Sequence, residues 1–356
     1  MSAFFGRKIA IDASMCLYQF IIAIRAGPDQ QNLTDDSGEI TSHLQGMFNR
    51  TLRLMDHGIK PVYVFDGKPP TLKGGELEKR KERRAEAEAE LKAAIDEESK
   101  DDIEKFQRRT VYVTKEQNAE CKRLLKLMGV PYVEAPGEAE ATCAAMTKAG
   151  LVYATGTEDM DALTFDSPRL IRNLMAAEAR GLPITEIDLE RALEALNMTR
   201  QEFIDLCILL GCDYTGTIRG IGPKKAFDLI RQYKTIEEAL KHIDKEKYPY
   251  DPEDFMYKEA AELFKQPEVA DVSSLELKWT APDEEGLMKF LVEEKGFNPE
   301  RVQRGIERLK KARQAGTQQR LENYFTVIPG KRRDNAAAAA AAAASSTSAK
   351  GKKVKR

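Results

Sequence analysis

The sequence predicts an α/β fold built on a mostly parallel central sheet flanked by helices. Two apolar, β-rich runs, Arg7–Ala13 and Lys60–Asp66, are typical of strands, and helical apolar spacing separates them at Met15–Ile24 and His43–Met55. Alternating strands and helices favour a parallel sheet, in which functional groups collect at the carboxyl ends of the strands. The chain has 356 residues, of which 42% are hydrophobic, and this is enough for one large domain or two smaller ones.

The same alternation continues along the chain. Three further strands are expected at Val130–Glu134, Leu151–Ala154 and Arg169–Leu174, each beside sequence with helical spacing. From Ile187 onward the pattern predicts an almost entirely helical structure, with Phe203–Leu210 as its most buried helix. We therefore expect the parallel sheet to be complete by about Leu174.

Two segments depart from this pattern. Lys73–Arg109 holds 11 basic and 12 acidic residues and no proline, which predicts long solvated helices held by ion pairs between successive turns. Beyond Gly316 the periodicity is lost, and the run of alanines at Ala336–Ala344 leads into a basic end. This low-complexity composition predicts a disordered tail.

The charge of the chain is unevenly divided. The formal net charge is −2, but residues 331–356 hold eight basic residues and one acid, a net of +7, so the first 330 residues carry −9. Such an acidic body is unusual for a nucleic-acid binder, whose affinity comes from Lys and Arg on phosphates. No apolar run approaches the ~20 residues of a membrane span, and the start MSAFFGRK has no hydrophobic signal core. We expect a soluble protein that is not exported by the usual route and has no membrane partner.

Cysteine and histidine are too sparse to carry the chemistry. The five cysteines form no Cys-x-x-Cys motif, and the histidines at 43, 57 and 242 are scattered. A disulfide framework, a zinc site and a histidine-based hydrolase are therefore not indicated. If the protein is an enzyme, its carboxylates must do the work.

Seven carboxylates occupy positions where an α/β fold would gather them. Asp12 and Asp66 end the first two strands, and the others follow strands or buried helices: Glu138, Glu140, Asp159, Asp161 and Asp213. Residues at i and i+2 diverge on a regular helix, so Glu138 and Glu140 share a site only if Glu138 lies in an imperfect first turn. Each acid alone has a structural explanation, as a turn residue or a partner of a helix dipole. Together they indicate oxygen ligation of two Mg²⁺ or Mn²⁺ ions and phosphodiester hydrolysis.

A glycine hairpin adds a candidate phosphate contact. The run RGIGPKKA from Arg219 to Ala226 places Gly220 and Gly222 before a helix that carries Lys224 and Lys225. Small residues let the backbone approach a phosphate, and helix amides with lysines bind it without reading sequence. A plain helix–helix turn with incidental lysines is the alternative.

Three more side chains are candidates near the second strand and the first helix. Lys73 and Arg80 follow the Asp66 strand and begin the charged segment, from which they would reach a transferring phosphate; a solvated helix with no role is the alternative. Tyr18, on the helix after Asp12, would either stack on a base or pack in the core.

The motifs IDAS, VFDGKPP, GEAEA, TEDMD, GCDY and RGIGPKKA together resemble those of the structure-specific 5′ nucleases, and the run from Phe5 to Phe325 resembles eukaryotic flap endonucleases closely. The resemblance implies a PIN-like nuclease core with a helical arch and a helix-two-turn-helix. It implies a Mg²⁺-dependent endonuclease and 5′–3′ exonuclease that cuts 5′ flaps from branched DNA during Okazaki-fragment maturation and long-patch base-excision repair. The seven carboxylates then hold two Mg²⁺ ions, with Mn²⁺ able to substitute.

The resemblance also assigns roles to other residues. It makes Lys73 and Arg80, with Asp159 and Asp161, catalytic, and Tyr18 the aromatic near the scissile nucleotide. DNA contacts fall on the following residues: Arg25, Arg50, Glu138, Gly211, Asp213, Gly220, Gly222, Lys224 and Lys225. The hairpin in this family carries a K⁺ ion.

A sliding-clamp-binding box is recognisable at the end of the predicted folded body. One helical turn would place Leu321, Tyr324 and Phe325 on one side as a hydrophobic plug, preceded by Gln318. The resemblance implies a monomer, with up to three copies on a trimeric clamp. It also implies a nuclear location, in nucleolus and nucleoplasm, with the mitochondrion as a second compartment; the basic end would serve as an import signal or a DNA tether.

The resemblance divides the chain into six parts. They are a nuclease region at 1–84, an arch segment at 85–101, a second nuclease region with the helix-two-turn-helix at 102–233, a helical part at 234–316, the clamp box at 317–325 and a disordered basic tail at 326–356.

One departure leaves an alternative open. Flap endonucleases begin with a Met-Gly-Ile opening upstream of the first catalytic strand, and this sequence begins MSAFFGRK instead. A catalytically impaired, clamp-tethered DNA-binding isoform is therefore the alternative function. An RNA nuclease or a Holliday-junction nuclease of the same fold is a third reading, against which the clamp box and the short arm argue.

Overall fold

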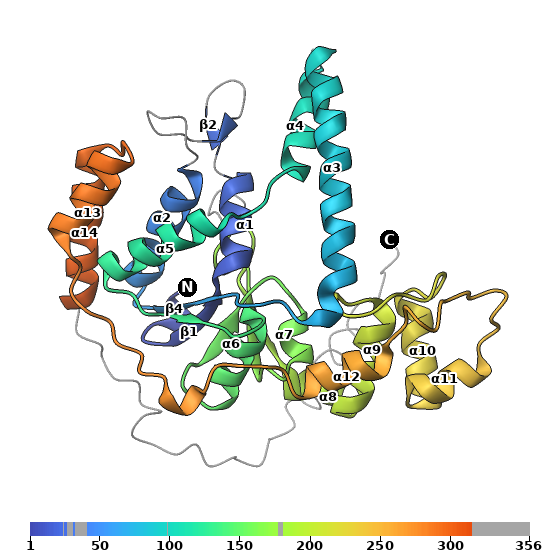
Figure 1. Ribbon diagram of the computed structural model, residues 1–356. Coiled ribbons are helices and arrows are strands. Elements are labelled where there is room, and N and C mark those ends of the chain that lie inside the picture. The colour runs from blue at the N-terminus through green and yellow to red at the C-terminus, as the bar shows by residue number, and fades with distance from the viewer. Residues whose placement is uncertain (24, 27–30, 33–40, 98, 177–180, 315–356) are drawn as a thin grey trace, which may run out of the picture. The chain divides into compact units, whose positions relative to one another are not determined.

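A six-stranded sheet lies at the centre of the fold, with strand order β5-β4-β1-β6-β7-β8 (Figure 1). Strands β5 to β7 in this order pair in parallel, and β8 pairs antiparallel with β7. The structure is a computed structural model that describes residues 1–23, 25–26, 31–32, 41–97, 99–176 and 181–314. The chain divides into two units, residues 1–317 and 318–356, and the second lies outside the described residues. The predicted mostly parallel sheet is confirmed.

The strands follow the predicted apolar runs closely. Their bounds are β1 Lys8–Asp12, β2 Arg25–Ala26, β3 Gln31–Asn32, β4 Lys60–Phe65, β5 Tyr132–Glu134, β6 Ala154–Gly156, β7 Arg169–Arg172 and β8 Thr185–Asp188; β2 and β3 form a separate small ribbon. β1 and β4 are buried along almost their whole length, because parallel strands are covered by helices on both faces.

The helices connect these strands and extend beyond them. Their bounds are α1 Ala13–Ala23, α2 Ser42–Asp56, α3 Gly74–Asp96, α4 Lys100–Arg109, α5 Lys115–Met128, α6 Ala139–Lys148, α7 Asp161–Thr164, α8 Leu189–Leu196, α9 Arg200–Leu210, α10 Pro223–Tyr233, α11 Ile236–His242, α12 Tyr257–Lys265, α13 Glu284–Met288 and α14 Pro299–Gln314. Short turns η1 Ser2–Phe4, η2 Thr71–Lys73 and η4 Val272–Ser274 and the π-helical η5 Lys289–Glu294 complete the described elements. None of the described helices is both long enough and apolar enough to cross a membrane.

The two faces of the sheet bury different side chains of the same strands. Ile9 and Ile11 of β1 pack with α1, α2, α5, α13 and α14, whereas Ala10 of β1 packs with α6 on the other face. The alternation follows the period of two along a strand. β1 therefore lies between two helical layers. Helices cover its faces, and its carboxyl end lies at the edge of the sheet.

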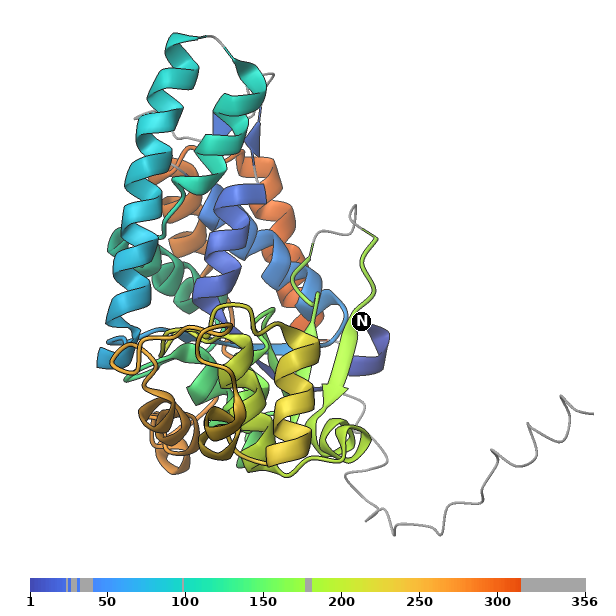
Figure 2. The same cartoon turned by 90° about the vertical axis from the view of Figure 1, so that its right-hand side faces the viewer.

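A pair of long helices rises from the carboxyl edge of the sheet. α3 and α4 contact each other, and Figures 1 and 2 both show the shorter α4 beside the part of α3 that lies farther from the sheet. Of the 23 residues of α3, Ala87 and Ala94 are buried, so i,i+3 and i,i+4 ion pairs such as Arg80–Glu76 and Lys81–Glu78 support it. The prediction of long solvated helices is confirmed.

A second core lies around α9 and α10, the two helices that flank the glycine hairpin. Tyr214 makes edge contacts with Phe165 and Phe264, whose rings are tilted against each other, and α9, α10 and α12 contribute to the same cluster. This core holds α9 beside α10, so Asp213, which follows α9, is attached to a rigid element. Leu210, at the end of the predicted buried helix, is 47% exposed.

The prediction of an almost entirely helical structure after Ile187 is wrong in several places, and two of these contact the sheet. β8 adds an edge strand whose first two residues are exposed, so its sequence carries too little apolar alternation to mark a strand. Residues 266–283, here called the strap, contain no α-helix. The strap runs back to the sheet, where Trp279 donates a hydrogen bond to the Pro61 carbonyl at 3.1 Å and the Thr280 amide donates one to the Gly129 carbonyl at 2.9 Å.

Candidate active site

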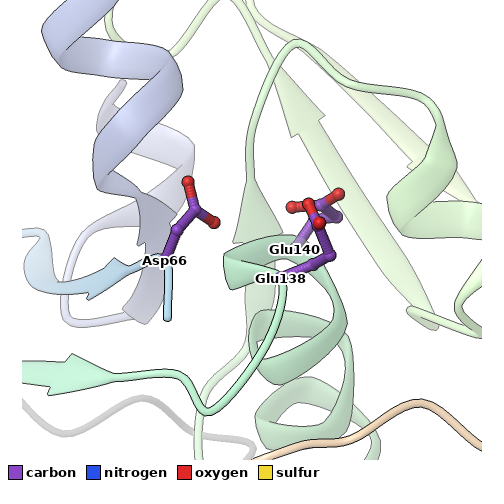
Figure 3. Close-up of side chains that lie close together, drawn as sticks. All are labelled: Asp66, Glu138 and Glu140. Atoms are coloured by element: carbon purple, nitrogen blue, oxygen red, sulfur yellow. The ribbon is translucent and has the colours of Figure 1, made fainter. Parts of the chain in front are cut away.

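Carboxylates from separate segments meet at the carboxyl edge of the sheet. Asp12 ends β1, Asp66 follows β4, and Glu138 and Glu140 begin α6. Figure 3 shows the two glutamates side by side, across from Asp66; ligand oxygens of these three side chains lie within 4.8 Å of one another. The structure therefore gathers acids that lie more than seventy residues apart in the sequence.

Glu138 and Glu140 share the site because of how α6 begins. Glu138 is the N-cap of α6, with extended backbone angles (φ −74°, ψ 136°), and Glu140 lies in the first turn. The sequence condition for a shared site, that Glu138 lie before the regular helix, is therefore met. The next amide, that of Ala139, donates to Asp66 Oδ1 at 2.8 Å, so the start of α6 also orients the third acid.

Backbone and hydroxyl donors fix the other acids. Asp12 accepts hydrogen bonds from the Met15 amide at 3.0 Å and from Thr157 Oγ1 at 3.1 Å. The Asp161 amide donates to Asp159 Oδ1 at 2.9 Å. Because these donors belong to helix starts and to the turn after β6, the carboxylates are held in place before any ligand binds.

Burial and mutual repulsion raise the pKa values of the buried acids. Burial, followed by the Asp66 charge, raises the pKa of Asp12 from 3.8 to about 7. Burial, with Asp159 and Asp213, raises that of Asp161 to about 7 as well. Burial and the charges of Asp12 and Glu138 hold the pKa of Glu140 well above its usual range. These acids lack enough positive charge around them.

Divalent cations fit this donor set. The gathered ligands are all carboxylate oxygens, which are the ligands that Mg²⁺ and Mn²⁺ prefer. Bound cations would also relieve the repulsion that raises the pKa values of Asp12 and Glu140. The residues that would hold them are the seven predicted carboxylates or a subset of these.

Lys73 and Arg80 supply positive charge at one side of the carboxylates. Lys73 Nζ lies 2.5 Å from Glu138 Oε2 and 3.4 Å from Asp213 Oδ2. The Arg80 guanidinium donates to both oxygens of Asp213, at 2.7 and 2.8 Å. The pKa of Lys73 is raised: its own burial lowers it, but the neighbouring Glu138 carboxylate outweighs that effect. Both residues remain cationic beside the site.

One cavity of about 930 Å³ extends from these carboxylates along α3 and α4, here called the arch helices. It is lined by six of the predicted acids (Asp12, Asp66, Glu138, Glu140, Asp159 and Asp213), by Lys73 and Arg80, and by Tyr18. Asp161 does not line it, although it is hydrogen-bonded to Asp159. The 41% exposure of Tyr18 favours a contact role over core packing.

The cavity also contains residues that the sequence patterns missed. Arg83, Arg84 and Arg109 line it, together with Tyr112. Arg83 and Arg84 were detectable, because they follow Arg80 by three and four residues and therefore share its face of α3. Arg109 and Tyr112 were not, because only the return of α4 toward α3 brings them there.

The predicted hairpin residues lie outside this cavity. Gly220 has φ +84°, Gly222 is the N-cap of α10, and Lys224 and Lys225 are exposed on its first turn. Gly211 ends α9 with φ +105°. The hairpin therefore presents a separate exposed surface, attached to the carboxylates through α9.

Two arginines and the clamp box are the remaining predicted site residues. Arg50 lies on α2, outside the cavity, and its charge acts on the buried thiol of Cys16. The side chain of Arg25 and all of Gln318, Leu321, Tyr324 and Phe325 lie outside the described residues.

Comparisons with known proteins agree with this geometry. Family models of the XPG N-terminal domain and the XPG I-region match residues 1–87 and 129–213, and the two ranges contain all seven carboxylates. Flap endonuclease 1 of Danio rerio is 56% identical over 359 residues, covering 100% of this chain and 94% of that relative.

Solved structures are similar over most of their length. The flap endonuclease-1 from Methanococcus jannaschii has a TM-score of 0.68 and 37% identity, covering 87% of this chain and 94% of its own. The catalytic core of Rad2 in complex with DNA substrate has a TM-score of 0.66 and 28% identity, covering 86% and 94%.

Proposed function

Because the chain belongs to the flap endonuclease family, we propose that it is a structure-specific 5′ flap endonuclease and 5′–3′ exonuclease. It hydrolyses phosphodiester bonds at the junction between a 5′ flap and duplex DNA. The observation that carries the proposal is the cavity in which six carboxylates face Lys73, Arg80 and the arginines of the arch helices. Phosphodiester hydrolysis needs both acidic ligands and cationic groups for the phosphate.

We propose that the site takes two Mg²⁺ ions, with Mn²⁺ able to substitute. The ligands would come from two sides of the site. The β1–β4–α6 side would supply Asp12, Asp66, Glu138 and Glu140, and the β6–α9 side would supply Asp159, Asp161 and Asp213. Activation of water and polarisation of the scissile phosphate are the chemistry that such ions supply when bound. A K⁺ ion at the hairpin of Gly220 and Gly222 is part of the same proposal.

The chain's own residues position and polarise the phosphate. Lys73 and Arg80 pair with Glu138 and Asp213 in the free protein, and they would donate hydrogen bonds to the non-bridging oxygens of the scissile phosphate. Such charge-assisted bonds strengthen as negative charge develops in the transition state. Tyr18 would stack on the nucleotide next to the cut.

The exposed hairpin would hold the duplex. Backbone amides at Gly220 and Gly222 and the ammonium groups of Lys224 and Lys225 suit phosphate oxygens without base readout. Arg25, Arg50 and Gly211 are further proposed DNA contacts. In this arrangement the junction is selected by shape: duplex on the hairpin, single strand in the cavity.

Incubation of the purified chain with 5′-flap, bubble and four-way-junction DNA, with Mg²⁺ and with EDTA, tests the proposal. We expect Mg²⁺-dependent cutting at the flap junction. Preferential cutting of the bubble or of the four-way junction would favour a different nuclease of the same fold.

The comparisons give no support to the alternative of an impaired DNA-binding isoform. The relative and the structure with the highest similarity reported above are both named as flap endonucleases, and the proposed ligands are all present here. Flap binding without cutting in the same assay would be the result that restores this alternative.

We further propose roles in Okazaki-fragment maturation and long-patch base-excision repair, at a nuclear location. Gln318, Leu321, Tyr324 and Phe325 would tether the monomer to the replicative sliding clamp, with up to three copies per trimeric ring. Clamp binding that survives replacement of Tyr324 and Phe325 by alanine would contradict this assignment.

A further inference from the structure

We infer that Tyr112 forms a second stacking subsite, which takes an unpaired nucleobase of the single strand inside the cavity. The inference rests on the proposed function, because that function supplies the single strand. It adds a contact to a base, whereas the residues assigned above on the arch contact phosphate or metal ligands.

Exposure singles out Tyr112 among the cavity residues. Tyr112 is 54% exposed and Tyr18 is 41% exposed, and they are the two tyrosines among the cavity-lining residues. A half-exposed ring beside guanidinium and carboxylate groups leaves apolar surface in contact with water. A stacked base would cover that surface, and every base has a face that suits it.

The chain holds Tyr112 at the cavity wall. It lies in the short connection between α4 and α5, where Val111 and Val113 are half-buried and Tyr112 is exposed. Val113 packs against the main core, and Thr114 caps α5 by exchanging hydrogen bonds with Gln117 at 3.0 and 3.1 Å. The packing of Val113 and the capping box at Thr114 restrict the backbone directly after Tyr112, which lowers the entropy cost of stacking.

Arg84 completes the subsite. Its guanidinium carbon lies 5.1 Å from the centroid of the Tyr112 ring, a distance typical of a cation–π contact. Arg84 follows Arg80 by one turn along α3, and Arg83 and Arg109 line the same cavity. A nucleotide here would place its base on Tyr112 and its phosphate near these guanidinium groups, one turn of α3 away from the residue that pairs with Asp213.

Tyr112 could contribute by stacking on a base or only by positioning Arg84. DNA that lacks bases distinguishes these two explanations. Binding of 5′-flap DNA is measured in EDTA, and single-turnover cutting in Mg²⁺, for the full chain and for Tyr112→Ala and Tyr112→Phe. One flap carries normal bases, and a second carries abasic residues with the same sugar-phosphate backbone. Ile95→Ala is the matched control, because Ile95 is a 53% exposed residue of α3 outside the cavity lining.

Stacking predicts a base-dependent effect. Tyr112→Ala should weaken binding of the base-bearing flap roughly 5- to 150-fold, whereas Tyr112→Phe and Ile95→Ala should remain near wild type. On the abasic flap, wild type and Tyr112→Ala should bind equally. An equal loss on both flaps would show that Tyr112 acts through Arg84, and no loss on either would show that no base stacks there; both results overturn the inference. If the wild-type chain neither binds nor cuts flap DNA, the proposed function fails and the subsite fails with it.

Discussion

Lys73 is placed to act on the phosphate, because its ammonium group already lies between Glu138 and Asp213. We expect Lys73→Ala to lower the single-turnover cutting rate by roughly 10²- to 10³-fold, the loss typical of one donor to developing charge. Flap affinity should change far less, since the rest of the cavity and the hairpin remain. Lys81→Ala is the control, because Lys81 is exposed on α3, the helix that follows Lys73, and pairs with Glu78. A Lys73→Ala rate close to that of the control would remove Lys73 from the mechanism.

Asp159 lines the cavity and accepts the Asp161 amide. Asp159→Ala removes one proposed ligand and one orienting acceptor, so we expect cutting to be abolished while flap binding is retained. Gel-shift and cleavage assays on the same flap DNA measure the two properties separately. Glu158→Gln is the matched control: Glu158 accepts the Asn173 amide and pairs with Arg172, and it should continue to support cutting. Normal cutting by Asp159→Ala would contradict the assignment of the site.

Single residues of the site differ in how far sequence could predict them. The acids were predictable, because the end of a parallel strand fixes which edge of the sheet a residue such as Asp12 or Asp66 occupies. Tyr112 was not, because its place depends on the packing of α4 against α3, and nothing in the local pattern specifies that contact. The mutual repulsion that raises the pKa of Glu140 is likewise a property of the assembled site.

At the scale of elements, the strap depends on one glycine. Gly129 ends α5 with φ +72°, and a Cβ there would lie 2.3 Å from the Thr280 carbonyl oxygen of the strap. Gly150 has the same φ, and nothing lies within 4 Å of its Cβ position. We expect Gly150→Ala to cost about 1–2 kcal/mol of unfolding free energy for the left-handed backbone alone. Gly129→Ala should cost more, because the collision with a backbone oxygen adds to the same strain.

Urea denaturation of both variants measures this difference. Hydrogen exchange adds the location: in Gly129→Ala the amide of Thr280 should lose protection, because its hydrogen bond to the Gly129 carbonyl requires the close approach. Equal destabilisation of the two variants would mean that the strap moves away from residue 129 with no loss of stability, and would contradict the prediction.

The strap also shows why part of the fold escaped prediction. Apolar runs such as Lys60–Phe65 mark buried strands locally, and the long charged segment marks solvated helices. Residues 266–283 lack either period, and their path is set by distant partners such as Pro61 and Gly129. β8 was missed for a related reason, since an exposed edge strand of four residues obtains its pairing from β7 and not from its own pattern.

For the whole molecule, the acidity of the body is largely an active-site property. The first 330 residues carry a net charge of −9, and the seven proposed ligands supply seven of these charges. The rest of the body is close to neutral, so the hairpin and the arch arginines do not have to bind DNA against a general negative field. Because these charges are concentrated, and Asp12, Glu138 and Glu140 are buried, they also act on the stability of the fold.

The sign of that effect follows from the pKa values. Asp12 and Asp161 hold their protons up to about pH 7 in the folded, metal-free protein, whereas both lose them near 3.8 when unfolded. The folded state therefore binds more protons between about pH 4 and 7. The free energy of unfolding falls as pH rises through this window, and the loss is complete above it. Divalent cations need the ionised carboxylates, so protons compete with them at low pH.

We therefore expect Mg²⁺ to raise the Tm of the protein more at pH 8 than at pH 5, by roughly 2–5 °C at saturating concentration. Asp12→Asn should raise the metal-free Tm at pH 8, because it removes one buried charge, and should reduce the response to Mg²⁺. Asp205→Asn is the control: burial also raises the pKa of Asp205, but Asp205 hydrogen-bonds Gln201 and the Ile236 amide outside the cavity, so this variant should keep the full Mg²⁺ response. Thermal unfolding of the three proteins with Mg²⁺ and with EDTA measures each effect. An equal Tm increase with Mg²⁺ at the two pH values would contradict metal binding by the buried carboxylates. A full Tm increase in Asp12→Asn would contradict it as well.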